Sequence, residues 1–116
     1  MANAKGKLNS FKFIIDVWNE PNSIGSFWRT GDVITTPTQA GIDYTKLVQE
    51  IRYRLNLETD DYVKGAFING AGMGQPNPNA EEWLTAAVNT SNSHDFSLKG
   101  LKALNSIGIH YYSNKL

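Results

Sequence analysis

A segment whose apolar residues recur at helical spacing lies between two short segments rich in β-branched and aromatic residues. This alternation restricts the fold more than any other feature. The segment Phe11–Trp18 has the nearly continuous apolar character of a buried strand in a parallel sheet. Thr36 and Pro37 then supply an N-cap and a first-turn proline. We expect a helix over about 38–56. Its apolar residues recur at helical spacing, at Tyr44, Leu47, Val48, Ile51 and Leu55.

The same alternation repeats toward the C-terminus. Val63–Ile68 is predicted to be a second strand, a capping box at Asn79 opens a short helix, and Ile107–Tyr112 is predicted to be a third strand. Helical connections of this length imply parallel strands with right-handed crossovers. The predicted fold class is therefore α/β, a βαβαβ segment with three parallel strands. Three strands do not close a barrel, and they leave two edges open. Between the second helix and the third strand we expect one more helical turn or two, from Leu98, Leu101 and Leu104.

Composition narrows the range of partners. The 116 residues suffice for one domain, in which the polar residues 1–10 are expected to form a frayed lead-in. Eleven basic and eleven acidic residues give a net charge of zero, so no basic field exists to hold nucleic acid. No segment approaches the roughly 20 apolar residues needed to span a bilayer. We expect neither nucleic acid nor a membrane as a partner. The N-terminus shows no apolar run like a signal peptide, and the compartment stays open.

The motif Trp18-Asn19-Glu20-Pro21 directly follows the first predicted strand. In α/β architectures, functional groups gather at the carboxyl ends of the strands. A carboxylic acid there can protonate a leaving group, and the amide of Asn19 can donate to and accept from a sugar hydroxyl. A plain polar turn would use the same residue types, so the motif alone leaves both interpretations open.

The run FIIDVWNEPN, residues 13–22, is followed by Phe27-Trp28. Together they resemble the fourth barrel strand of clan A glycoside hydrolases, and most of all the pattern of family 39-like and family 5-like enzymes. Later segments are similar to those enzymes as well. The similarity extends to their fourth helix at Tyr44–Leu55, their fifth strand and its glycine-rich exit at Val63–Gly72, and their sixth strand with its His-x-Tyr end at Ile107–Tyr112.

This resemblance covers roughly residues 11–113 and implies a segment of a TIM (β/α)₈ barrel, strands four to six. It also implies roles. Glu20 would be the general acid/base of a retaining O-glycosidase, and Asn19 would bind the hydroxyl next to the anomeric carbon. His110 would line the substrate cleft and Tyr112 would hydrogen-bond the nucleophile, although both would equally suit packing at a strand end. The implied partner is an oligo- or polysaccharide, with no metal and no organic cofactor, and the parent family is often secreted.

Two tryptophans and one short-range pair need separate interpretation. Trp28 would either stack on a sugar ring or pack against Phe27 and its loop. Trp83 lies in a predicted helix and is expected in the core. One His and one Asp, at His94-Asp95, do not make a metal site.

The chain departs from the family pattern in lacking a credible nucleophile. A retaining glycosidase places two carboxyl groups about 5–5.5 Å apart. Asp16 is four residues before Glu20 on the same strand, so the two Cα atoms are roughly 13 Å apart. Asp32 has no positional signal, and Asp60 and Asp61 precede the second strand, at the wrong end of the sheet. The family nucleophile follows the seventh strand, and a barrel needs about 250 residues, so the resemblance makes this chain a partial barrel.

Two alternatives to an enzyme therefore remain. The chain would be a non-catalytic carbohydrate-binding remnant that keeps Asn19, Glu20 and Trp28. Otherwise it would be a small α/β interaction protein whose open sheet edges pair with a second copy or with the missing half of the barrel.

Overall fold

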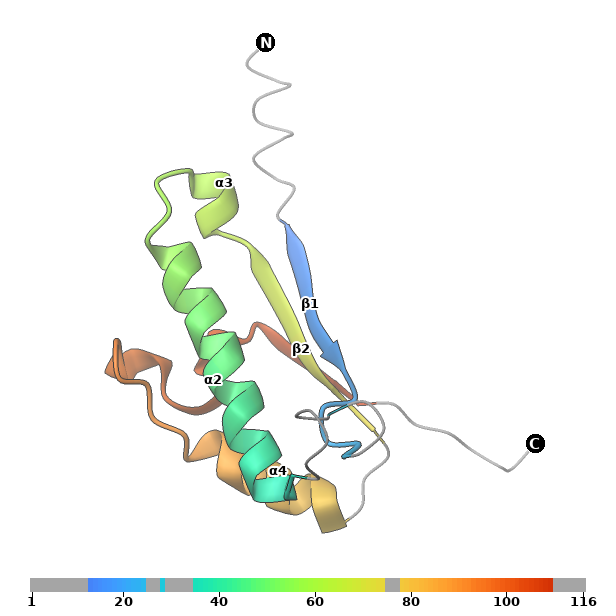
Figure 1. Cartoon of the computed structure of the whole chain (residues 1–116). Helices are drawn as coiled ribbons and strands as arrows, with labels where there is room; N and C mark the ends of the chain where they lie inside the picture. The colour runs from blue at the N-terminus through green and yellow to red at the C-terminus, as the bar shows by residue number, and fades with distance from the viewer. Residues whose placement is uncertain (1–12, 25–27, 29–34, 75–77, 110–116) are drawn as a thin grey trace, which may run out of the picture.

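The computed structural model describes residues 13–24, 28, 35–74 and 78–109, and the predicted lead-in over 1–10 lies outside this part. Its strands form one parallel sheet in the order β1-β2-β3, and Figure 1 shows them running side by side. The prediction of an α/β chain with three parallel strands in sequence order is confirmed. The strands are β1 (Ile14–Asn19), β2 (Phe67–Met73) and β3 (Ser106–Ile109).

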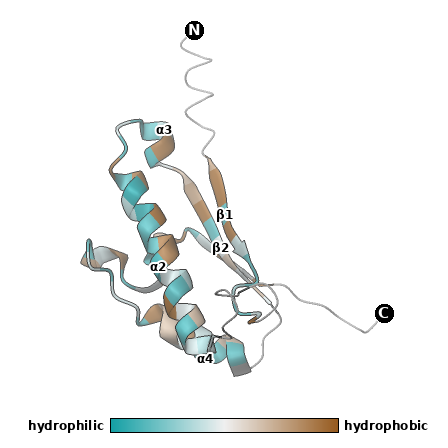
Figure 2. Cartoon of the chain, viewed as in Figure 1, coloured by the Kyte–Doolittle hydropathy of each residue, from teal (hydrophilic) through white to brown (hydrophobic). Residues whose placement is uncertain are grey.

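The helices of the described part lie along one side of this sheet (Figure 1). They are α2 (Pro37–Asn56), α3 (Asp61–Lys64) and α4 (Pro78–Val88), followed by the 3₁₀ helices η1 (Phe96–Leu98) and η2 (Gly100–Ala103). Helix α2 begins as predicted, because the Thr36 hydroxyl accepts a hydrogen bond from the Gln39 amide at 3.1 Å. Figure 2 shows teal and brown patches alternating along α2, which is typical of an amphipathic helix.

The predicted second strand, Val63–Ile68, begins and ends too early. The Asp60 carboxylate accepts a hydrogen bond from the Tyr62 amide at 2.9 Å and caps α3, so Val63 belongs to a helical turn. The strand starts only at Phe67 and runs on to Met73, through Gly and Asn residues that are unfavourable in strands. The segment after Ile68, which the prediction left outside the strand, therefore supplies most of β2.

The other boundaries differ less. Strand β1 includes Asn19, one residue beyond the predicted end, and β3 starts at Ser106. The part of the third predicted strand beyond Ile109 lies outside the described residues. The helical turns predicted near Leu98 are two separate 3₁₀ helices, because Lys99 between them has a non-helical backbone with φ −51° and ψ 140°.

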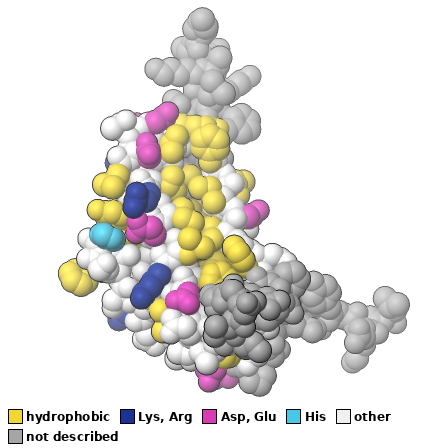
Figure 3. Space-filling view, viewed as in Figure 1, with side chains coloured by type: hydrophobic (Ala, Val, Ile, Leu, Met, Phe, Trp, Pro, Cys, Tyr) yellow, Lys and Arg dark blue, Asp and Glu magenta, His cyan; other side chains and the backbone are white. Residues whose placement is uncertain are grey.

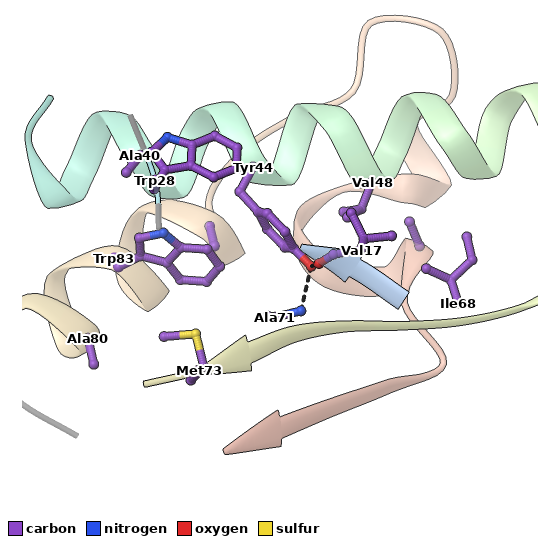
Figure 4. Packing of buried hydrophobic residues seen from close by; sticks show 12 residues of the cluster. Val17, Trp28, Ala40, Tyr44, Val48, Ile68, Ala71, Met73, Ala80 and Trp83 are labelled. Atoms are coloured by element: carbon purple, nitrogen blue, oxygen red, sulfur yellow. Dashed lines mark hydrogen bonds between the residues drawn. The ribbon is translucent and has the colours of Figure 1, made fainter. Parts of the chain in front are cut away.

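The core lies between the sheet and the helices α2 and α4. Trp83 is fully buried there, as expected, and Figure 4 shows its ring beside Tyr44 and Trp28. The two helices approach closely at Gly41, where a Cβ atom would lie 2.4 Å from the Trp83 carbonyl oxygen. Glycine is therefore required at this crossing.

The sheet also carries exposed apolar side chains. Ile14 is 70% exposed, and its partner in the register, Phe67, is exposed as well. Figure 3 shows hydrophobic side chains gathered in a band over the region where Figure 1 draws β1 and β2. On the edge strand β3, Ile107 and Ile109 are also exposed. The helices of the described part thus leave apolar surface of the sheet in contact with solvent.

Candidate functional site

Tyr44 of α2 joins the carboxyl halves of β1 and β2. Its hydroxyl donates a hydrogen bond to the Val17 carbonyl oxygen at 2.7 Å and accepts one from the Ala71 amide, the bond drawn as a dashed line in Figure 4. The side chain is fully buried, and this burial raises the pKa of the phenol to about 12. The hydroxyl of the neutral phenol therefore acts as both donor and acceptor, and its two hydrogen bonds hold the ends of β1 and β2 against α2.

The backbone turns sharply at these strand ends. Trp18, Glu20 and Ala71 all have positive φ, at 66°, 46° and 46°, and the pairing of β2 with β3 shifts register between Gly70 and Met73. Left-handed backbone is uncommon for residues other than glycine and clusters at functional sites. The three positions make the carboxyl end of the sheet its irregular end, and this end is therefore the candidate location of a functional site.

Glu20 is held at this end by the backbone. Its amide donates to the Gly72 carbonyl oxygen at 2.9 Å, and its own carbonyl oxygen accepts from the Ser23 amide at 2.9 Å. The buried Asn22 side chain then accepts a hydrogen bond from the Gly74 amide at 2.7 Å. The segment after β1 is thus joined to the end of β2 at two points, which fixes the position of Glu20.

The Glu20 carboxylate lies beside Gly74. A Cβ atom at position 74 would be 2.7 Å from Glu20 Oε1 and 2.9 Å from the Ser23 hydroxyl oxygen. The absence of a side chain at Gly74 leaves room for the carboxylate. Glu20 is only partly buried, so a solvent-borne ligand has access to the residue.

A pocket of about 430 Å³ opens at the same end of the sheet. Its polar side is a row of hydrogen bonds across the three strands. The Asn69 amide nitrogen donates to Asp16 Oδ1 at 2.6 Å, and the Ser106 hydroxyl donates to Asn69 Oδ1. Glu20 is not part of the wall, whose described residues are Asp16, Trp18, Asn19, Asn69, Gly70 and Gly72.

Trp28 lies in the core and not in this pocket. Its ring is 8% exposed and makes T-shaped contacts with Trp18 and Tyr44, with centroid distances of 5.2 and 5.9 Å. The indole nitrogen of Trp28 has no hydrogen-bond partner among the described residues. This burial favours the packing alternative over sugar stacking.

The predicted site residues thus divide into three groups. Asn19 lines the pocket and Glu20 lies beside it, Trp28 packs beneath, and His110 and Tyr112 lie outside the described residues. Asn69 escaped prediction because the second strand was expected to end at Ile68. The period-two spacing of Phe67 and Asn69 after a buried run was the available signal.

The acidic residues considered as nucleophiles offer no replacement within the described part. Asp16 hydrogen-bonds Asn69, and Asp60 caps α3 at the other end of β2. Asp32 lies outside the described residues. In the same described part, no three His, Asp or Glu side chains gather closely enough to hold a metal ion. None of the helices described there is long and apolar enough to cross a membrane.

Comparison of the chain with protein-family models, with curated proteins and with solved structures gives no match.

Proposed function

We propose that the chain is the acid/base-bearing part of a retaining glycoside hydrolase, and that its sheet forms strands four to six of a TIM barrel. One observation carries the proposal: Glu20 follows a parallel strand directly, and its backbone is fixed to Gly72 at the carboxyl end of the neighbouring strand. That end of a (β/α)₈ sheet is where the catalytic residues of such enzymes lie.

In this proposal Glu20 first acts as the general acid and protonates the oxygen of the leaving sugar. It then acts as the general base and takes a proton from the water that releases the product. Asn19, which lines the adjoining pocket, binds the hydroxyl next to the anomeric carbon. His110 and Tyr112, which lie outside the described residues, support the substrate and the nucleophile in this proposal.

A carboxylate outside the described residues must attack the anomeric carbon. The two carboxyl groups of a retaining enzyme are about 5–5.5 Å apart. Asp16 precedes Glu20 by four residues on β1 and is hydrogen-bonded to Asn69, so it does not meet this requirement. In this proposal, barrel strands other than β1, β2 and β3 supply the nucleophile.

The test uses the polypeptide encoded in frame around these residues, assayed against unactivated oligosaccharides. We expect hydrolysis, and we expect Glu20→Gln to lower turnover by about 10²–10⁴-fold, the usual contribution of acid–base catalysis. Glu58→Gln is the matched control, because Glu58 is exposed just after α2. Absence of hydrolysis, or hydrolysis that Glu20→Gln leaves unchanged, would contradict the proposal.

A non-catalytic carbohydrate-binding protein is the second candidate. The pocket beside Trp18 favours it, since binding requires the pocket but not the missing nucleophile. The two candidates differ in one measurement: the second predicts saccharide binding to the same in-frame polypeptide without hydrolysis.

A further inference from the structure

Trp18 is exposed in an arrangement that suits ligand stacking. Its side chain is 53% exposed and forms part of the pocket wall, while its T-shaped contact with the buried Trp28 supports it from the core. A large aromatic side chain costs free energy when it is exposed to water, and such exposure marks binding surfaces. The φ of 66° at Trp18 adds a strained backbone at the same residue.

Another part of the pocket wall is polar and preoriented. Ser106 donates to Asn69 Oδ1, which turns the amide nitrogen of Asn69 toward Asp16 Oδ1 at 2.6 Å. A carboxylate has lone pairs for about four hydrogen bonds, and an amide nitrogen has two donors. Asp16 and Asn69 can therefore bind further hydroxyl groups without breaking the bond between them.

The charge of the wall limits the ligand. Asp16 is the one charged residue among the six described residues that line the pocket. An acidic ligand would be repelled there, whereas a neutral polyhydroxylated ligand would meet acceptors, donors and one aromatic face. The volume of about 430 Å³ falls in the range of roughly 300–1,000 Å³ that is usual for small-molecule sites.

We propose that this pocket is a subsite for one neutral pyranose ring, with Trp18 stacking on the C–H face of the ring and with Asp16 and Asn69 binding hydroxyls at its edge. The proposal rests on the proposed saccharide function and deepens it by naming the subsite and its preference for neutral sugars. Trp18 takes the stacking role that the sequence offered to Trp28. A ring whose hydroxyls are mostly equatorial has the flat C–H face that such stacking requires.

The experiment is a titration of the ¹⁵N-labelled 116-residue chain, followed by two-dimensional NMR. The probes are xylotetraose and cellotetraose, which are neutral, and tetragalacturonate, which is acidic. We expect a neutral probe to shift the Trp18 indole and Asn69 side-chain amide signals, and Trp18→Ala to weaken this binding at least tenfold. Phe96→Ala is the matched control, since Phe96 is 85% exposed and does not line the pocket. The same spectra show whether each variant is folded, and Trp18→Phe, which keeps an aromatic ring, should retain part of the affinity.

Asp16→Asn tests the charge preference. Asp16→Asn should weaken binding of the neutral probe, because an amide oxygen accepts hydrogen bonds less strongly than a carboxylate. It should also reduce the preference for the neutral probe over tetragalacturonate. No shift at Trp18 or Asn69 with either neutral probe, unchanged affinity in a folded Trp18→Ala variant, or equal binding of acidic and neutral probes would overturn the subsite.

Failure of the subsite and failure of the hydrolase are distinguishable. The subsite is tested by binding to the 116-residue chain, and the hydrolase is tested by turnover of the in-frame polypeptide, so the two readouts are independent. Trp18-dependent binding together with an in-frame polypeptide that does not hydrolyse saccharides would retain the subsite and reject the enzyme. Glu20-dependent hydrolysis together with binding that does not depend on Trp18 would retain the enzyme and reject the subsite.

Discussion

The indole rings of Trp18 and Trp28 meet in a T-shaped contact with their centroids 5.2 Å apart, yet one ring is 53% exposed and the other 8%. T-shaped aromatic pairs add about 0.5–1.5 kcal/mol beyond the area that they bury. Trp28 thereby extends the core up to the sheet end and supports Trp18 at the surface. The site is built on the core rather than on a separate loop.

The pH dependence of stability should reveal the buried phenol of Tyr44. Its pKa is raised from 10.0 to about 12, chiefly because burial disfavours the phenolate. The folded state therefore binds the phenol proton more tightly than the unfolded chain does. The resulting contribution to the free energy of unfolding is fully present below pH 10 and is lost as the pH rises from 10 to 12. A shift of this size corresponds to about 2–3 kcal/mol.

The measurement is urea unfolding of the parent and of Tyr44→Phe between pH 8 and pH 12. The variant should be less stable at pH 8, by about 1–3 kcal/mol, because the Ala71 amide loses its partner. The difference between the two proteins should shrink toward pH 12. Tyr62→Phe is the control, and a constant difference across the pH range would contradict the assignment.

Gly41→Ala should destabilise the protein even though alanine is the better helix former by about 1 kcal/mol. The added Cβ would lie 2.4 Å from the Trp83 carbonyl oxygen and would force α2 and α4 apart. We expect a net loss of about 1–3 kcal/mol in the free energy of unfolding, typical of overpacking. Thermal unfolding measures it, and a variant as stable as the parent would show that the two helices do not cross at this position.

Gly74→Ala should act on function more than on stability. Its Cβ would meet the ends of two side chains, Glu20 Oε1 at 2.7 Å and Ser23 Oγ at 2.9 Å, and both can move. The carboxylate of Glu20 would be displaced, and turnover by the in-frame polypeptide should fall at least tenfold. Gly108→Ala is the comparison, because its Cβ would meet only Gly72 Cα, at 3.9 Å. Equal turnover in the two variants would count against a role for the position of Glu20.

The isolated 116-residue chain should show no glycosidase turnover. It has Glu20 but no second carboxylate placed to attack the anomeric carbon among its described residues. The assay uses a panel of aryl glycosides with Glu20→Gln as the control. Turnover that disappears in Glu20→Gln would mean that the chain, alone or as an assembly, forms a complete site.

The sequence predicted the order and direction of the strands because its capping and periodicity signals are strong. Thr36 and Pro37 mark the start of α2, and the apolar stripe behind them runs to its end. Helical connections of this length between neighbouring strands then imply that the strands are parallel. Periodicity and capping, which are local signals, carried this part of the prediction.

The second strand was misplaced because local propensity and tertiary pairing disagree there. Val63 is a strand-favouring residue, but Asp60 caps a helical turn around it. Asn69, Gly70 and Gly72 disfavour strands, yet pairing with β1 on one side and β3 on the other makes them one. Half of the described pocket wall, Asn69, Gly70 and Gly72, lies in that stretch, and local propensity did not predict that half.

The sequence also did not predict how far Trp18 and Trp28 are exposed to solvent. Trp18 sits in a strand-like run that suggests burial, and Trp28 follows in a loop. The structure reverses the expectation for Trp18, which has a left-handed φ and is 53% exposed. For Trp28, where stacking and packing were both open, the aromatic contacts favour packing. These features depend on tertiary structure.

The dependence of turnover on the leaving group tests the role of Glu20 most directly. The comparison is between the in-frame polypeptide and its Glu20→Ala variant, each with an unactivated disaccharide and with a dinitrophenyl glycoside of the same sugar. Protonation matters for the first leaving group and hardly for the second. We predict that Glu20→Ala lowers cleavage of the disaccharide by about 10²–10⁴-fold and slows the formation of the glycosyl-enzyme from the dinitrophenyl glycoside far less. An equal loss with both substrates, or no loss with either, would contradict the assignment of Glu20 as the general acid/base.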